Sequence, residues 1–184
     1  APEAPESWRD WVHGWGWLRD LASSGPLGKA EVMRAEALAK RWLARFHDYD
    51  EEAWAPAATG RRILMAACHA PLIMPGQDHI HRSAVLNGVA RWGRHLDRAA
   101  PRMQPGFGRA EAAAGLIGCA LLLPGGDERL ARAQALMAET LEQLLPPEGV
   151  GAASRSPLDL ARLGDLMLVL AAFHEPRAQR PPPL

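Results

Sequence analysis

The sequence predicts an all-α domain, and three observations support this fold class. Alanine and leucine are abundant while valine, isoleucine and threonine are scarce, which favours helix over sheet. Apolar residues recur at the three- and four-residue spacing of helices. Proline and glycine punctuate the segments, as at Gly25-Pro26 and Pro75-Gly76. We expect seven helices, over residues 7–22, 29–47, 58–72, 78–99, 109–123, 127–145 and 157–174.

The first expected helix contains four of the chain's seven tryptophans. Trp8, Trp11 and Trp15 are spaced i, i+3 and i+7, so they form one apolar stripe that packs on a core. The alternative is an aromatic platform for a ligand that also includes Trp17, because an indole lies flat against a sugar while its N–H keeps a polar partner. Core packing is the first interpretation and the ligand platform is the second.

The turns at 25–26 and 75–76 bound the next expected helices, 29–47 and 58–72. Asp78 is a candidate N-cap for the helix 78–99. That helix carries one apolar stripe and should cover a core from outside. The stripe consists of Val85, Val89, Trp92 and Leu96.

The last three expected helices differ in character. Residues 110–123 and 166–173 are apolar on nearly every side, so neighbouring helices must enclose them. The helix 127–145 follows the candidate N-cap Asp127, and Ser156 before Pro157 gives a cap with proline at the first helical position. An outward-facing helix is predicted for 127–145 by its single apolar stripe, Leu130, Met137, Leu141 and Leu144.

Enclosed and covering helices that alternate along the chain, joined by short turns, predict antiparallel helical hairpins in two layers. A partial α/α toroid of about seven helices has this character. We expect a flexible leader over 1–6, one helical domain over 7–174 and a proline-rich tail or linker over 175–184. A half-toroid alone would expose its apolar inner helices, so a missing C-terminal region or a partner chain should cover them.

Composition and charge exclude several classes of function. Lysine plus arginine equals aspartate plus glutamate, 21 against 21, so no net field attracts nucleic acid. No apolar run reaches the roughly 18 residues of a membrane span. Cys68 and Cys119 lie in apolar helical runs and are interpreted as buried free thiols, with a disulfide as the alternative. No His, Cys and Asp cluster has metal-ligand spacing, and we expect neither a metal nor a cofactor.

Four segments together resemble the N-terminal helical region of bacterial heparinase II/III-like proteins. The resemblance covers most of the chain and implies an α/α toroid that precedes a β-sandwich in complete members. It also implies an acidic-polysaccharide lyase that acts by β-elimination. The sequence leaves open whether the compartment is the periplasm or the cytoplasm of a bacterium. The four segments are HGWGWLRDL (13–21), EAWAPAATGRRILMAACHAPLIM (52–74), LIGCALLLPGGDERLARAQALM (116–137) and GVGAASRSPLDLARLGDLM (149–167).

The sequence departs from the family pattern at both catalytic motifs. Asp159 and Leu160 follow the Ser-Pro turn where the family has its Tyr-His pair, and Phe107 and Gly108 stand near the place of its Asn-His pair. The implied acid, base and carboxylate-neutralising groups are therefore not matched. What the resemblance implies for these 184 residues is saccharide binding without catalysis of their own.

Arginine and tryptophan are the candidates for holding an acidic saccharide. Arg61 and Arg62 follow Thr59-Gly60 at an expected helix start, where free N–H groups favour anions. Each arginine has the alternative of an ion pair with an acid of the chain itself. His69 is either a core histidine bonded to backbone or a cleft residue. The complete candidate ligand-binding set is Trp15, Trp17, Arg19, Arg61, Arg62, His69, Arg109 and Arg155.

We therefore expect the helical domain of a heparinase II/III-like lyase that binds a uronate-containing polysaccharide. The alternative is a non-enzymatic helical scaffold or protein-interaction domain derived from the same fold.

Overall fold

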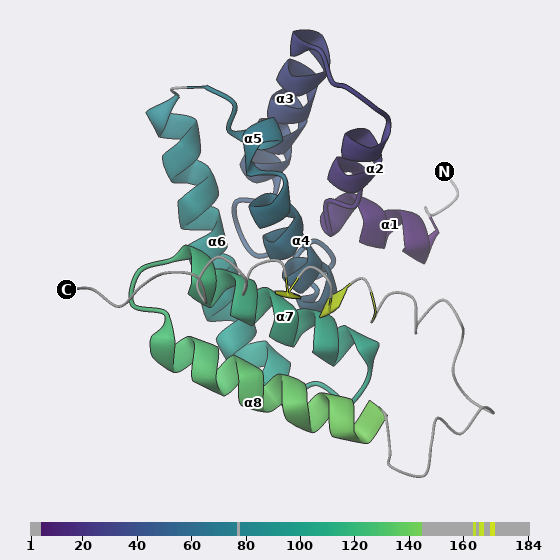
Figure 1. The fold of residues 1–184 in the computed structure, drawn as a ribbon, viewed down its shortest axis with the longest axis vertical. Helices are drawn as coiled ribbons and strands as arrows, with labels where there is room; N and C mark the ends of the chain where they lie inside the picture. Colours follow the sequence, from purple (N-terminus) through teal and green to yellow (C-terminus); the bar gives the residue numbers. More distant parts are fainter. Residues whose placement is uncertain (1–4, 77, 145–163, 165, 168–169, 172–184) are drawn as a thin grey trace.

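The computed structural model describes residues 5–76 and 78–144, together with residues 164, 166, 167, 170 and 171. Within this part of the chain every regular element is a helix, as the composition predicts (Figure 1). The elements are α1 (Glu6–His13), α2 (Trp17–Ser23), α3 (Lys29–Arg45), α4 (Pro56–Cys68), α5 (Ala70–Ile73), α6 (His79–Ala99), the 3₁₀ turn η1 (Ala100–Arg102), α7 (Phe107–Leu122) and α8 (Asp127–Leu144).

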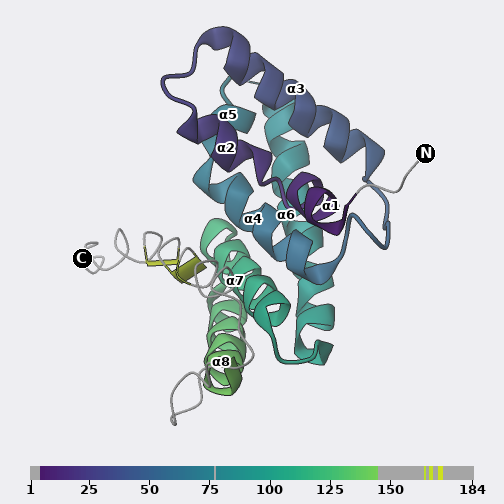
Figure 2. The ribbon, with the colours of Figure 1, turned by 90° about the vertical axis from the view of Figure 1, so that its right-hand side faces the viewer.

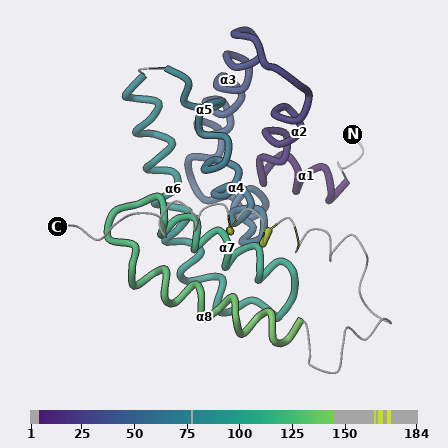
Figure 3. Tube along the Cα trace, in the orientation of Figure 1, coloured from purple at the N-terminus to yellow at the C-terminus, as the bar shows by residue number. Residues whose placement is uncertain are grey.

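Helices α4 and α7 cross at the centre of the molecule and form its most extensive helix–helix contact. Helix α6 packs on both of them, while α8 covers α7 from the side away from α4 (Figures 1 and 2). Helix α3 packs on α5 and α6, and α1 packs on α4. The trace in Figure 3 follows the chain from α1 and α2, through α3 to α6, to α7 and α8 at the other end. None of these described helices combines the length and the apolar character that crossing a bilayer requires.

The single helix expected over 7–22 is wrong, because the chain breaks between α1 and α2. Trp15 has a φ of 58°, in the left-handed region that continues no right-handed helix. This turn directs the Trp15 ring into the core, where it is 0% exposed. Trp8 and Trp11 stay on α1 and are 53% and 40% exposed. The three rings therefore do not share one buried stripe.

The expected helix 58–72 is also divided. Helix α4 begins two residues earlier, with Pro56 at its first position, where a missing N–H costs nothing. It ends at Cys68, and the short α5 follows with Pro71 in its first turn. Proline cannot continue the preceding helix because its ring meets the carbonyl four residues back.

Helix α6 confirms two expectations. The Asp78 carboxylate accepts a hydrogen bond from the His81 backbone N–H at 2.9 Å and caps the helix. The predicted apolar stripe is buried against α4 and α7, with each member at most 2% exposed. That stripe is Val85, Val89, Trp92 and Leu96.

Helix α7 is enclosed, as its apolar composition predicts. Its central residues from Ala112 to Ala120 are all buried, and α4, α6 and α8 surround them. The cover of this helix thus comes from the chain's own described residues. Of the other apolar segment, Leu166 is buried while Met167 and Leu170 are partly buried.

The two cysteines are free thiols, but only Cys119 is buried. Cys68, at the last position of α4, is exposed, which corrects the expectation for that residue.

On α8, Met137 and Leu144 of the predicted stripe are buried. Two expected features, the tail over 175–184 and the Ser156-Pro157 cap, lie outside the described residues. Of the expected leader over 1–6, the structure describes residues 5 and 6.

Candidate functional site

Two of the arginines proposed for an acidic ligand, Arg61 and Arg109, are engaged with acids of the chain. Arg61 pairs with Asp10 at 3.0 Å and with Glu111 at 3.3 Å. Arg109 is 6% exposed, and its guanidinium donates to Glu139 at 2.9 Å. These are the intramolecular pairs that the sequence left as the alternative. Arg155 lies outside the described residues.

Arg62 is a core residue with 0% exposure. Because α4 begins at Pro56, Arg62 lies in its second turn, away from the free N–H groups of the first. One guanidinium nitrogen donates to the carbonyls of His13 and Ala53, at 2.6 and 2.8 Å. The other donates to the Thr59 hydroxyl at 3.1 Å. This placement gives Arg62 a role inside the fold and no access to solvent.

The core around Arg62 is aromatic. Its guanidinium carbon lies 4.3 Å from the ring centroid of Trp42 and 4.4 Å from that of Trp92. Trp15 meets both rings edge to face, at centroid distances of 5.6 and 5.7 Å. Trp15 is thus enclosed by protein, whereas Trp17 remains partly exposed at the start of α2.

Two members of the candidate set interact electrostatically. His69, between α4 and α5, has its pKa lowered by burial and, to a smaller extent, by the charge of Arg19. Arg19 is exposed on α2, the same helix that Trp17 begins. Trp17, Arg19 and His69 therefore remain accessible or partly accessible, unlike Arg62 and Trp15.

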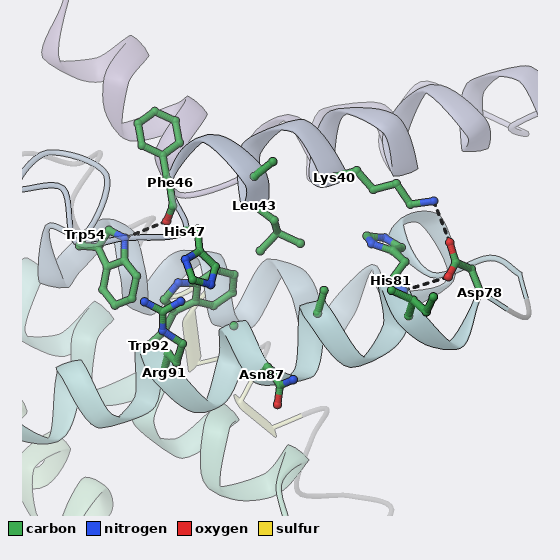
Figure 4. Close-up of a pocket in the computed structure, with 14 residues that line it drawn as sticks. Lys40, Leu43, Phe46, His47, Trp54, Asp78, His81, Asn87, Arg91 and Trp92 are labelled. Atoms are coloured by element: carbon green, nitrogen blue, oxygen red, sulfur yellow. Dashed lines mark hydrogen bonds and ion pairs between the residues drawn. The ribbon is translucent and has the colours of Figure 1, made fainter.

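A groove of about 540 Å³ lies between α3 and α6 (Figure 4). Four residues at successive helical spacing form its α3 wall, and they continue just past the end of that helix. They are Lys40, Leu43, Ala44 and His47, at i, i+3, i+4 and i+7.

The facing wall is a second stripe, on α6. Its members are Ile80, Ala84, Asn87 and Arg91, at i, i+4, i+7 and i+11. This stripe lies beside the buried one that includes Val85 and Val89 and is mainly exposed. Ile80 is 85% exposed, which is unusual for so apolar a side chain. None of these four residues was a candidate from the sequence, although their helical spacing is visible there.

At one end of the groove, the cation is already paired with carboxylates of the chain. Lys40 Nζ lies 2.8 Å from Glu36 and 3.0 Å from Asp78, and these bonds raise the pKa of the lysine. The pKa of Asp78 is lowered mainly by the hydrogen bond from the His81 backbone N–H, and to a smaller extent by the hydrogen bond from Lys40. The ring of His81 bonds the Ile73 carbonyl at 2.7 Å.

The other end contains Arg91, Trp54 and His47 (Figure 4). The Arg91 guanidinium lies 5.4 Å from the centroid of the Trp54 ring, whose N–H donates to the Phe46 carbonyl at 3.2 Å. His47 contacts its exposed neighbour Asp48 at 3.1 Å. Among the described residues, Arg91 forms no ion pair with a carboxylate.

The lining of the groove combines apolar and charged side chains. It presents apolar side chains and small residues between a paired lysine and an arginine that no carboxylate of the described residues meets. Its lining includes no cysteine, serine or threonine that could act as a nucleophile. Among the residues that the structure describes, no three potential metal ligands gather anywhere.

Comparison with known proteins identified one relative of note. FtsZ-localized protein C of Caulobacter vibrioides (strain NA1000 / CB15N) is 30% identical over 146 residues. The match includes 79% of this chain but 24% of that protein, so the chain spans about a quarter of its relative's length. No family model and no solved structure matches the chain.

Proposed function

We propose that this chain is a non-enzymatic helical docking domain that binds a segment of a protein partner in the α3/α6 groove. The observation that carries the proposal is the groove itself: an open, largely apolar channel between two helices, with an arginine at one end that pairs with no described carboxylate. Grooves of this kind receive the apolar face of an amphipathic segment. Three of the arginines that would have favoured a polysaccharide, Arg61, Arg62 and Arg109, are engaged within the described part of the chain.

The similarity to FtsZ-localized protein C supports a specific setting for this docking. That protein's name places it with FtsZ, and the match extends over most of the present chain. We therefore propose that the chain docks at FtsZ assemblies.

Co-sedimentation of the purified chain with FtsZ filaments tests this function. The change to make is Ala84→Trp, which fills the groove from an exposed position on α6 and should leave the fold intact. We expect wild type to sediment with filaments and the variant to lose at least nine-tenths of that binding. Ser83→Trp is the matched control, because Ser83 is exposed on the same helix and does not line the groove.

Two results would count against the proposal. Wild type that stays in the supernatant at every filament concentration would remove the link to FtsZ. Equal sedimentation of wild type and Ala84→Trp, with unchanged thermal unfolding, would show that the groove is not the binding site.

A second candidate is the binding of an acidic polysaccharide by a partial α/α toroid, as the heparinase-like resemblance implies. The observation that favours it is that Arg19 and, in part, Trp17 are accessible on the same helix, α2, and that the charge of Arg19 contributes to the lowered pKa of His69. Titration with uronate oligosaccharides, read by tryptophan fluorescence, tests it. Arg19→Ala should weaken the response at least fivefold, and Arg34→Ala, at an exposed arginine of α3, should not.

A further inference from the structure

The two ends of the α3/α6 groove differ in electrostatic balance. At the Lys40 end, one cation contacts two carboxylates, those of Glu36 and Asp78. At the Arg91 end, the described residues supply no carboxylate to the guanidinium. A bound segment that carries a carboxylate would form an ion pair with Arg91 at the second end. At the first end it would find Lys40 already paired.

The Arg91 guanidinium is held for such a contact. It lies over the Trp54 ring, and a ring face attracts a cation and limits its motion. Trp54 is itself fixed by its hydrogen bond to the Phe46 carbonyl and is 6% exposed. A planar guanidinium offers two parallel N–H groups, the geometry that a carboxylate accepts in bidentate fashion.

Between the two ends, the groove is shaped for a helix. Ile80 and Arg91 are eleven residues apart on α6, which corresponds to about 17 Å, or three helical turns. Ala84 and Gly88 on one wall and Ala44 on the other leave room for a backbone to approach. At Gly88, an added Cβ would lie 3.3 Å from the Trp92 ring and 3.4 Å from Leu43, so small size matters at the groove floor.

We propose that the groove binds an acidic amphipathic helix of about three turns, and that a carboxylate at one end of it pairs with Arg91. Its apolar face, with residues at i, i+3, i+4 and i+7, contacts Leu43, Ile80 and Ala84. The unequal ends of the groove set its direction. This inference rests on the proposed docking function and adds the chemistry and the orientation of the partner segment.

Selection of 15-residue peptides from a random displayed library on the whole chain tests the inference. We expect the selected sequences to be enriched in aspartate or glutamate and in apolar residues at helical spacing. The tightest peptide, labelled with fluorescein, then serves as the probe in anisotropy titrations. Arg91→Glu should weaken its binding at least tenfold, whereas Arg94→Glu, at an exposed arginine one turn along α6 that does not line the groove, should change it less than twofold.

A charge exchange makes the test specific. Replacing the peptide's critical acid with lysine should weaken binding to wild type and restore at least half of the lost affinity for the Arg91→Glu variant. Selected peptides without acids, or equal losses in Arg91→Glu and Arg94→Glu, would overturn the inference.

The failure of this inference differs from failure of the docking function. If the peptides fail to bind Ala84→Trp but bind Arg91→Glu normally, the groove remains the docking site and the acidic character of the partner is rejected. A chain that forms a dimer in solution, which Ala84→Trp dissociates, would show that a second copy occupies the groove and would also reject the inference.

Discussion

Arg62 shows how a charged residue becomes part of a core. Its guanidinium lies between the Trp42 and Trp92 rings and donates hydrogen bonds to three oxygens. Burial lowers the pKa of this guanidinium, but arginine starts so high that it stays protonated at neutral pH. The ring faces and carbonyl dipoles therefore replace the carboxylate that usually accompanies a buried cation.

Arg62→Met should lower the free energy of unfolding by about 2–4 kcal/mol, because it leaves the buried carbonyls of His13 and Ala53 without donors. Urea unfolding followed by circular dichroism measures this. The neighbouring Arg61→Met removes ion pairs of a side chain that is 24% exposed, so it should cost about 1 kcal/mol or less. Equal costs for the two variants would contradict the structural role assigned to Arg62.

Among the helices, the crossing of α4 and α7 depends on two glycines. A Cβ added at Gly115 would overlap the Gly60 Cα, and one added at Gly60 would overlap the Glu111 carbonyl oxygen. Side chains at these positions would separate the two backbones. The close contact lets α4 and α7 form the centre around which the other helices pack.

Gly115→Ala should therefore destabilise the protein by about 3 kcal/mol, since the added methyl meets backbone that cannot move aside. The thermal unfolding midpoint reports the effect. Gly108→Ala is the control on the same helix, because its Cβ would make an ordinary 3.4 Å contact with Ala57. The control should be neutral or up to about 1 kcal/mol more stable through helix propensity, and a similar loss in both variants would argue against the close crossing.

Across the whole molecule, burial of histidines on separate elements links stability to pH. Burial lowers the pKa of His13 at the end of α1, of His69 between α4 and α5, and of His95 on α6. The unfolded chain, with histidine pKa values of about 6.5, binds these protons more readily than the folded one. Stability is therefore full above that value and falls as the pH decreases through it.

We expect the unfolding midpoint to decrease when the pH is lowered from about 7.5 to about 5.5, the range in which histidine takes up its proton. His13→Gln, which keeps a hydrogen-bond acceptor near the Trp42 N–H, should reduce this dependence, and His79→Gln at an exposed site should leave it unchanged. Differential scanning calorimetry across this range measures both. A midpoint that rises on acidification would contradict the expected sign.

The helical class, most helix positions, the Asp78 cap and the enclosure of α7 could all be predicted from the sequence, because they follow from local periodicity and composition. Arg61, Arg62 and Arg109 could be named as candidates for a ligand, but the acids and carbonyls that they meet could not. Those partners come from distant segments: His13 is 49 residues from Arg62, and Glu139 is 30 residues from Arg109.

The inward turn of Trp15, and the way stripes from α3 and α6 face each other across a groove, depend on the tertiary structure. Each stripe is visible in the sequence as a helical spacing, yet the way α3 meets α6 depends on long-range contacts, such as Trp42 against Trp92 and Leu43 beside Gly88. Local sequence decides what a helix can present on each face, whereas long-range packing selects which faces meet and which stay open to a partner.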